Sequence, residues 1–140
     1  MRIALILLLI VTIFIPGLTQ NNKNVFDKPS IKIHCATPTF VSLGQSIKLK
    51  VRVSHNLQQE KTGQLTLAII NQQTKKSVDG WFVNIFPFQY FTTILNEPFE
   101  TEFPFTVPFD YLGKFELEIV ARVNQISDSV HFTIPTRKVK

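Results

Sequence analysis

The amino-acid sequence predicts an all-β domain in which two antiparallel sheets pack face to face. Hydrophobic residues make up 44% and charged residues 18% of the 140 residues, a composition typical of globular proteins. Phe accounts for 13 residues, and Val, Ile and Thr are abundant, which favours strands over helices. Apolar and polar residues alternate along most of the chain, and nowhere do apolar residues repeat at helical spacing over three turns.

The first residues are predicted to be a secretory signal peptide, covering residues 1–20. Arg2 gives a positive start, and residues 3–15 are apolar except for Thr12. An apolar run of about 13 residues is shorter than the roughly 20 that a membrane-spanning helix needs. We therefore expect a secreted or periplasmic protein that meets a membrane only through this segment, if it stays uncleaved. Residues 21–30 are expected to form a flexible linker.

The folded body is predicted to span residues 31–136. In residues 47–54, apolar side chains alternate with Lys, Arg and Ser, so the strand has one buried and one solvated face. The same alternation recurs downstream. The predicted strands cover residues 31–34, 47–54, 65–69, 99–107, 115–123 and 130–134, and residues 81–91 supply one or two more.

Turn-forming residues separate these strands, at 44–45, 60–63, 79–80, 96–98, 108–113 and 125–128. About seven short strands at such intervals are typical of an immunoglobulin-like antiparallel β-sandwich. Phe115 and Leu117 occupy the places where such domains carry a corner tyrosine and a second cysteine. We therefore expect neither the corner hydrogen bond nor the disulfide between the sheets.

Charge and cysteine content narrow the function classes. The net charge is +5, and Arg2 together with Arg137, Lys138 and Lys140 accounts for most of it. Residues 137–140 are predicted to be a solvated basic tail on a nearly neutral body. Because this is not a basic patch interleaved with aromatic residues, we expect no nucleic-acid partner. Cys35 is the sole cysteine, so no internal disulfide can form.

Several motifs resemble, in their order and spacing, one domain of the alpha-2-macroglobulin family, closest to its bacterial-type members. The resemblance covers roughly residues 35–137. The motifs are TPTFVSLGQ at 37–45, VRVSHN at 51–56, TKKSVD at 74–79, NEPFETEFPFTVP at 96–108, YLG at 111–113, IVAR at 119–122 and ISD at 126–128.

The resemblance implies a β-sandwich spacer that precedes the thioester domain in large secreted or periplasmic proteins that trap proteases. Such a domain has no catalytic residue of its own. The sequence has no room for a bait region, and Cys35 is followed by Ala36-Thr37-Pro38 instead of the Gly-Glu-Gln of a thioester. The resemblance therefore extends to fold and compartment but not to the trapping chemistry.

We expect a non-enzymatic binding or spacer module without catalytic residue, cofactor or metal. Two alternatives stay open: a protease-inhibitor component that acts with a partner chain, and a small secreted enzyme that uses Cys35 or a histidine. Adjacent strand side chains point to opposite faces, so His34 would not readily meet Cys35. His34, His55 and His131 match no metal-binding spacing.

Residues 81–91 carry more large apolar groups than a core requires. A central strand buried on both faces is one interpretation, and an edge strand with one open face is the other. Alternation places Phe86, Phe88 and Tyr90 on one face, opposite Trp81, Val83 and Ile85. Pro87 cannot donate a ladder hydrogen bond, which favours an edge or a bulge. We expect Phe86, Phe88 and Tyr90 to contact a protein partner or a second copy of the chain.

Overall fold

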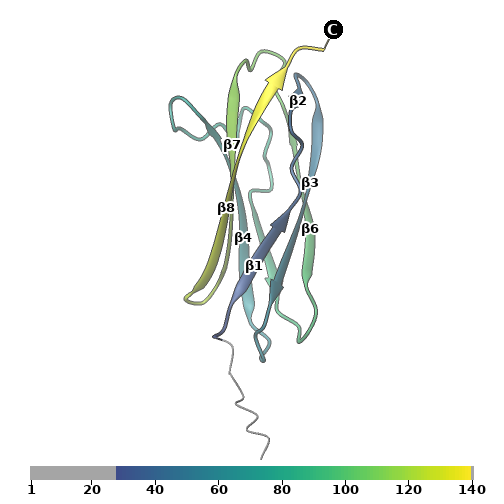
Figure 1. Ribbon diagram of the computed structural model, residues 1–140. Helices are drawn as coiled ribbons and strands as arrows, with labels where there is room; N and C mark the ends of the chain where they lie inside the picture. Colours follow the sequence, from purple (N-terminus) through teal and green to yellow (C-terminus); the bar gives the residue numbers. More distant parts are fainter. Residues whose placement is uncertain (1–27, 140) are drawn as a thin grey trace, which may run out of the picture.

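The computed structural model describes residues 28–139, and its strands form two packed sheets (Figure 1). The strands are β1 (Ile31–Cys35), β2 (Val41–Ser42), β3 (Ser46–His55), β4 (Thr62–Asn71), β5 (Phe88–Thr92), β6 (Phe99–Thr106), β7 (Lys114–Val123) and β8 (Ile126–Arg137). One sheet has the strand order β1-β3-β6 and the other the order β2-β8-β7-β4-β5. The predicted immunoglobulin-like β-sandwich is thereby confirmed.

The predicted signal peptide, residues 1–20, and most of the predicted linker lie outside the described residues. No helix of the described segment has the length and hydropathy that a membrane crossing requires.

The core lies between the inner faces of the two sheets, where the predicted alternation places its apolar residues. β4 and β7 show the pattern most clearly, because every second residue is buried from Gly63 to Ile69 and from Phe115 to Val123. The largest fully buried side chains are Phe82, Phe103, Phe115, Leu49, Leu65, Leu67, Ile69, Leu117, Ile119, Ile134, Val41 and Val51. Apart from Phe82, each of these belongs to a β-strand.

The chain changes sheet between β1 and β2. β1 pairs with β3 in the smaller sheet, and residues 36–40 then carry the chain to β8 in the larger sheet. The β2–β8 pair is parallel, which departs from the antiparallel arrangement predicted for the whole fold. The two termini of the described chain lie at opposite ends of the sandwich (Figure 1).

Parts of two predicted turns and of the predicted tail belong to strands instead, namely residues 62–63 in β4 and residues 126–128 and 137 in β8. Gly63 lies inside β4, where it pairs with Phe91 of β5. Asp128 lies in β8, and its Oδ2 accepts a hydrogen bond of 2.8 Å from the backbone N–H of Ile33, which ties β8 to the edge of the other sheet. Arg137 ends β8, and its guanidinium lies 4.0 Å from the ring centroid of Phe40, so the basic tail begins one residue later than predicted.

A tyrosine hydroxyl does hold the turn before β7, although its bond is not the corner bond expected to be missing at Phe115. Tyr111 supplies this hydroxyl, which donates to the carbonyl of Lys114 at 2.9 Å and accepts from Nδ2 of Asn71 at 3.0 Å. Phe115 instead contributes to the core and is fully buried. Tyr111 lies four residues before Phe115. Its two hydrogen bonds stabilise this turn in addition to the packing of Phe115 in the core.

Residues 81–87 do not form the predicted strand. They make a turn and an irregular segment, and regular pairing begins only at Phe88. Val83 has a φ of 53°, a left-handed conformation that interrupts the extended backbone. Pro87 lacks an N–H but its carbonyl accepts from Leu67, so it marks the start of an edge strand. The central-strand interpretation is therefore wrong for this segment.

Candidate functional site

The segment between β4 and β5 lies along the second half of β4. The N–H of Val78 donates to the carbonyl of Ile69 at 2.8 Å, and the N–H of Leu67 donates to the carbonyl of Pro87 at 2.9 Å. Between these two bonds, Oδ1 of Asp79 accepts from the N–H of Ile69 at 2.8 Å. The segment is thus held at both ends.

Two inward-pointing side chains, Phe82 and Asn84, anchor this segment. The Phe82 ring packs at 4.8 Å from that of Phe115, measured between centroids. Nδ2 of Asn84 donates to the carbonyl of Leu67 at 3.0 Å and to Asp79 at 2.9 Å. The Phe82 carbonyl also accepts from the N–H of Thr106 at 2.7 Å, which joins the segment to the opposite sheet.

Phe82 and Asn84 point inward, whereas the large apolar side chains around them and along β5 are exposed to solvent. The exposed fractions are 50% for Trp81, 51% for Val83, 65% for Ile85, 57% for Phe86, 61% for Phe88 and 72% for Tyr90. The prediction that one of the two aromatic sets would be buried is therefore wrong. The irregular backbone turns Phe82 and Asn84 inward and leaves Trp81, Val83 and Ile85 outside. The register of β5 independently directs Phe88 and Tyr90 outward.

Phe86, Phe88 and Tyr90, here called the β5 surface, are all exposed. In the strand register Phe88 lies beside Thr66 of β4 and Tyr90 beside Gln64, so both face outward from the larger sheet. Sequence analysis overlooked the exposed neighbours Ile94 and Leu95, which follow β5 directly. In the sequence, the feature that could have identified them is an apolar pair directly before the predicted turn at residues 96–98.

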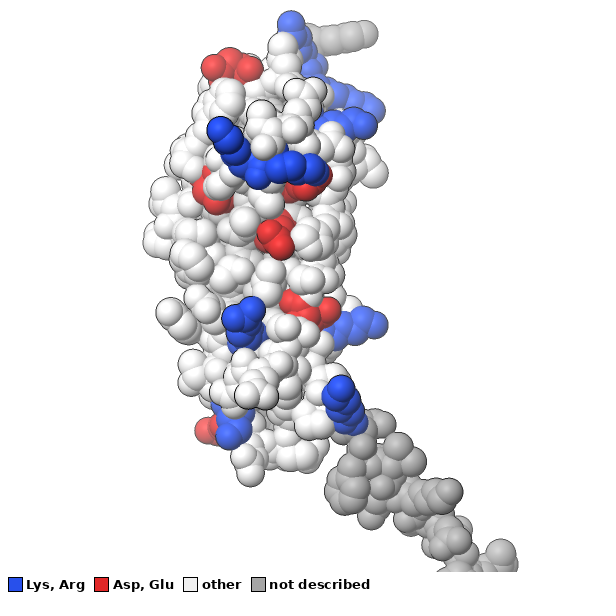
Figure 2. Space-filling model, turned by 90° about the vertical axis from the view of Figure 1, so that its left-hand side faces the viewer, with Lys and Arg blue, Asp and Glu red and all other residues white. Residues whose placement is uncertain are grey.

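Charged side chains are sparse around the β5 surface. Figure 2 looks onto the side of the molecule formed by β8, β7 and β4, and its charged side chains are spread from the upper to the lower end, most of them away from the left-hand margin. The left-hand margin of Figure 2 has no charged side chains over most of its height. β5 is the edge strand at the end of the larger sheet opposite β2 and β8. An uncharged surface with large apolar side chains is suited to contact with another protein.

The backbone of the segment that leads to β5 stores strain. Val83 is β-branched and has a positive φ of 53°, a conformation that such residues rarely adopt. Oδ1 of Asn84 is buried and has no hydrogen-bond partner among the described residues. Strained positions that are held by their surroundings cluster at functional sites, which directs attention to this segment.

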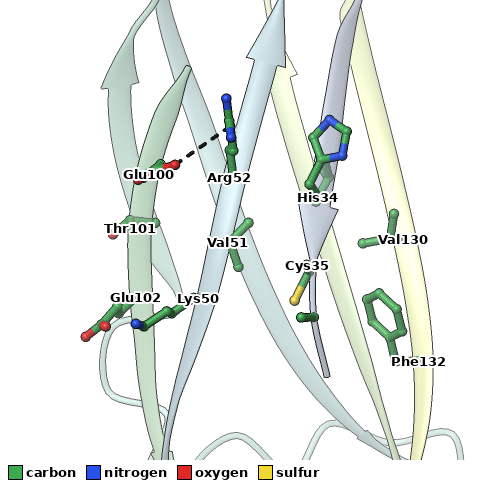
Figure 3. A pocket seen from close by; sticks show the side chains of 12 residues that line it. His34, Cys35, Lys50, Val51, Arg52, Glu100, Thr101, Glu102, Val130 and Phe132 are labelled. Atoms are coloured by element: carbon green, nitrogen blue, oxygen red, sulfur yellow. Dashed lines mark ion pairs between the residues drawn. The ribbon is translucent and has the colours of Figure 1, made fainter. Parts of the chain in front are cut away.

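A second candidate is the cavity beside Cys35 (Figure 3). It has a volume of about 820 Å³ and lies where β1 ends, with Val130 and Phe132 of β8 opposite and Lys50 and Arg52 at its rim. Burial raises the pKa of the Cys35 thiol from its ordinary value of 9.0 to about 11. The group is therefore a neutral thiol at neutral pH and a poor nucleophile.

The three histidines lie apart and serve local contacts. Nε2 of His34 shares a hydrogen bond of 3.0 Å with the Ser54 hydroxyl, and Figure 3 shows its ring pointing in a different direction from the Cys35 side chain. Nε2 of His55 lies 3.1 Å from the carbonyl of Glu97. Nε2 of His131 lies 3.7 Å from the Glu118 carboxylate. Within residues 28–139, no group of three or more His, Cys, Asp or Glu side chains is placed to hold a metal ion.

The described residues thus form an immunoglobulin-like β-sandwich. No protein-family model matches the chain, and no curated protein matches it.

Two solved structures are similar in fold. The first is the CARDB domain of the PF1109 protein from Pyrococcus furiosus, solved in complex with di-metal ions, with a TM-score of 0.57 and 12% identity over 79% of this chain and 90% of that one. The second is a beta-glucosidase from Listeria innocua in complex with gluconolactone, with a TM-score of 0.49 and 12% identity over 77% of this chain and 16% of that one. The first likeness shows the sandwich fold alone. Neither protein is an alpha-2-macroglobulin, so that resemblance stays a prediction.

Proposed function

We propose that this chain is a secreted, non-enzymatic protein-binding module and that the β5 surface contacts its partner. The observation that carries the proposal is the exposure of Phe86, Phe88 and Tyr90, at 57%, 61% and 72%, on and just before β5, an edge strand of the larger sheet that contains no charged residue. Large aromatic side chains that project from a rigid element are effective anchors of protein interfaces, because they bury much area at little cost in conformational entropy.

The anchoring of the preceding segment supports the same proposal. Phe82 and Asn84 fix its backbone from the inside, so the exposed side chains are presented by a defined framework. A surface held in its binding conformation before contact loses less entropy on association.

An enzyme that uses Cys35 or a histidine has less support. The pKa of Cys35 is raised to about 11, which is opposite to the lowered value that an active thiol needs. His34 is engaged with Ser54. Ala36 follows Cys35 in place of the Gly of a thioester motif, so protease trapping through a thioester is not part of the proposal.

The proposal is tested by capture from the extracellular fraction of the cells that produce the protein. The tagged chain is compared with the double variant Phe88→Ser/Tyr90→Ser, and captured proteins are identified by mass spectrometry. Both side chains are exposed, so the melting temperature should change by less than about 2 °C. Retention of the partner should fall to background.

The matched control is Phe109→Ser/Leu112→Ser, which removes two apolar side chains of comparable exposure, 81% and 66%, from a loop outside the β5 surface. This variant should retain the partner. Equal retention by the wild type and the Phe88→Ser/Tyr90→Ser variant would contradict the proposed role of the β5 surface.

A further inference from the structure

The two sheets end in the strands β1, β6, β2 and β5, and because β2 pairs only with Thr136 and Arg137, the rest of β8 is an edge as well. The edges of β6, β1 and β2 carry protective features. At β6, the N–H of Thr106 is taken by the carbonyl of Phe82 at 2.7 Å, and Pro104 has no N–H to offer. The carbonyl of Glu102 accepts from Nε2 of Gln89 at 3.0 Å. Such devices stop an edge strand from pairing with another chain.

The β1 and β2 edges are protected by side chains. The N–H of Ile33 points away from β3 and is taken by the Asp128 carboxylate at 2.8 Å. β2 has two residues, and the N–H of Ser42 donates to Oε1 of Gln45 at 2.9 Å. Short strands and local acceptors leave little for an incoming strand to pair with.

The β5 edge has no such protection. On either side of β5, the Pro87 carbonyl accepts from Leu67 N–H and the Thr93 N–H donates to the Lys61 carbonyl. The backbone groups of the odd-numbered residues 87–93 therefore point towards β4. Because backbone groups alternate in direction along an antiparallel strand, those of Phe88, Tyr90 and Thr92 point away from β4. Within residues 28–139, no hydrogen bond satisfies these outward N–H and carbonyl groups.

We propose that β5 pairs antiparallel with β5 of a second copy of this chain, with the two-fold axis at Tyr90. Phe88 of each copy then lies opposite Thr92 of the other, and the two Tyr90 residues exchange backbone hydrogen bonds. The two larger sheets become one continuous sheet. This inference deepens the proposed function and rests on it, because the same β5 surface is used and its partner is identified as a second copy.

The composition of β5 favours a second copy as the occupant. The strand reads FQYFT and has no charged residue, so pairing with itself brings no like charges together. The other long edges carry charged residues: Lys32 in β1, Glu100 and Glu102 in β6, and Asp128 in β8. The apolar surface also continues past both ends of β5, so that exposed Phe86 of one copy is directed towards exposed Ile94 and Leu95 of the other.

Amide hydrogen exchange of the full secreted chain, followed residue by residue by NMR over a concentration series, tests the backbone pairing. The amides of Gln89 and Phe91 bond to β4 and should be protected at every concentration. Those of Phe88, Tyr90 and Thr92 should exchange fast in dilute solution and slow by about tenfold or more as the dimer forms. If they exchange at the same fast rate when sedimentation shows a dimer, contact is made elsewhere and the inference fails.

Variants at the axis test the register. Tyr90→Lys places two like charges opposite each other and should raise the dimer dissociation constant by about tenfold or more. Ser129→Lys, on the outer face of β8, should leave it unchanged. The melting temperature of each variant checks that the fold is intact.

Cross-linking gives an independent check. In a Cys35→Ala background, Tyr90→Cys should be joined into a covalent dimer by a short bis-maleimide, whereas Ser129→Cys should not. A wild-type chain that stays monomeric up to near-millimolar concentration would overturn the inference. The capture experiment on Phe88→Ser/Tyr90→Ser would still decide the proposed function separately.

Discussion

At the residue scale, the local environment of Cys35 sets its chemistry. The side chain is partly buried beside the cavity between β1 and β8, and desolvation raises its pKa from 9.0 to about 11. Burial disfavours the charged thiolate, because the neighbouring Val130 and Phe132 offer nothing to solvate it.

We predict that the alkylation rate of Cys35 by iodoacetamide rises with a midpoint near pH 11 in the native chain and near 9 in concentrated urea. Since the folded pKa lies above the unfolded one, the contribution of this thiol to stability is complete below about pH 9 and is lost as the pH rises towards 11. The rate at each pH is measured by mass spectrometry. A native midpoint at or below 9 would show that the thiol is activated.

The sequence predicted the burial of single residues correctly but missed a hydrogen bond between side chains. Strict alternation identified Leu65, Leu67 and Leu117 as core residues, because every second residue of a half-buried strand faces inward. The role of the Tyr111 hydroxyl was missed because its partners, Asn71 and the Lys114 carbonyl, meet it only in the folded chain. Patterning therefore predicted burial but not side-chain hydrogen bonds between distant residues.

At the scale of elements, the position of β5 depends on a contact between a glycine and an aromatic ring. A Cβ atom placed on Gly63 would lie 2.4 Å from the Phe91 ring, closer than any real contact. Phe91 in turn stacks on Phe99 of β6, with ring centroids 5.0 Å apart. The missing side chain of Gly63 therefore lets β5 lie against β4 while its inner face reaches the opposite sheet.

We predict that Gly63→Ala destabilises the fold by about 1–3 kcal/mol, because Phe91 must shift and lose its stacking. Gly80→Ala is the control, since a Cβ at Gly80 would meet nothing within 4 Å. That variant should change the free energy of unfolding by less than about 0.5 kcal/mol. Urea unfolding followed by circular dichroism measures both. Equal midpoints would mean that β5 adjusts without cost.

The elements that were predicted correctly are those with long, regular alternation, such as β3, β4 and β7. The segment from Trp81 to Pro87 was misjudged because its apolar residues fit a strand template equally well. Its true backbone is decided by tertiary contacts: the burial of Phe82, the bond from Thr106 and the positive φ of Val83. The exposure of the β5 surface was foreseen, but the segment that presents it was not.

At the scale of the whole molecule, the two sheets are joined by polar links as well as by the core. Asp128 reaches Ile33 on one side of the sandwich, and Phe82 reaches Thr106 on the other. Gln89 bridges β5 to the carbonyl of Glu102, and its Oε1 accepts from the Thr101 hydroxyl. These links close the sandwich without a disulfide.

For the whole chain we predict that the secreted form lacks about 20 N-terminal residues, because residues 3–15 are apolar but too short to span a bilayer comfortably. The intact mass of protein purified from the extracellular fraction measures this directly. A full-length mass recovered with the membrane fraction would show that the segment serves as an anchor instead.

The placement of the two chain ends has a mechanical consequence. Because β1 begins at one end of the sandwich and β8 finishes at the other, anything joined to the two ends is held apart by the full length of the domain (Figure 1). Tension along that axis runs nearly parallel to the strands and loads the β1–β3 and β2–β8 hydrogen bonds in shear, so that several must break together. Single-molecule extension would reveal this as a higher unfolding force for pulling from the ends than for pulling across the sheets.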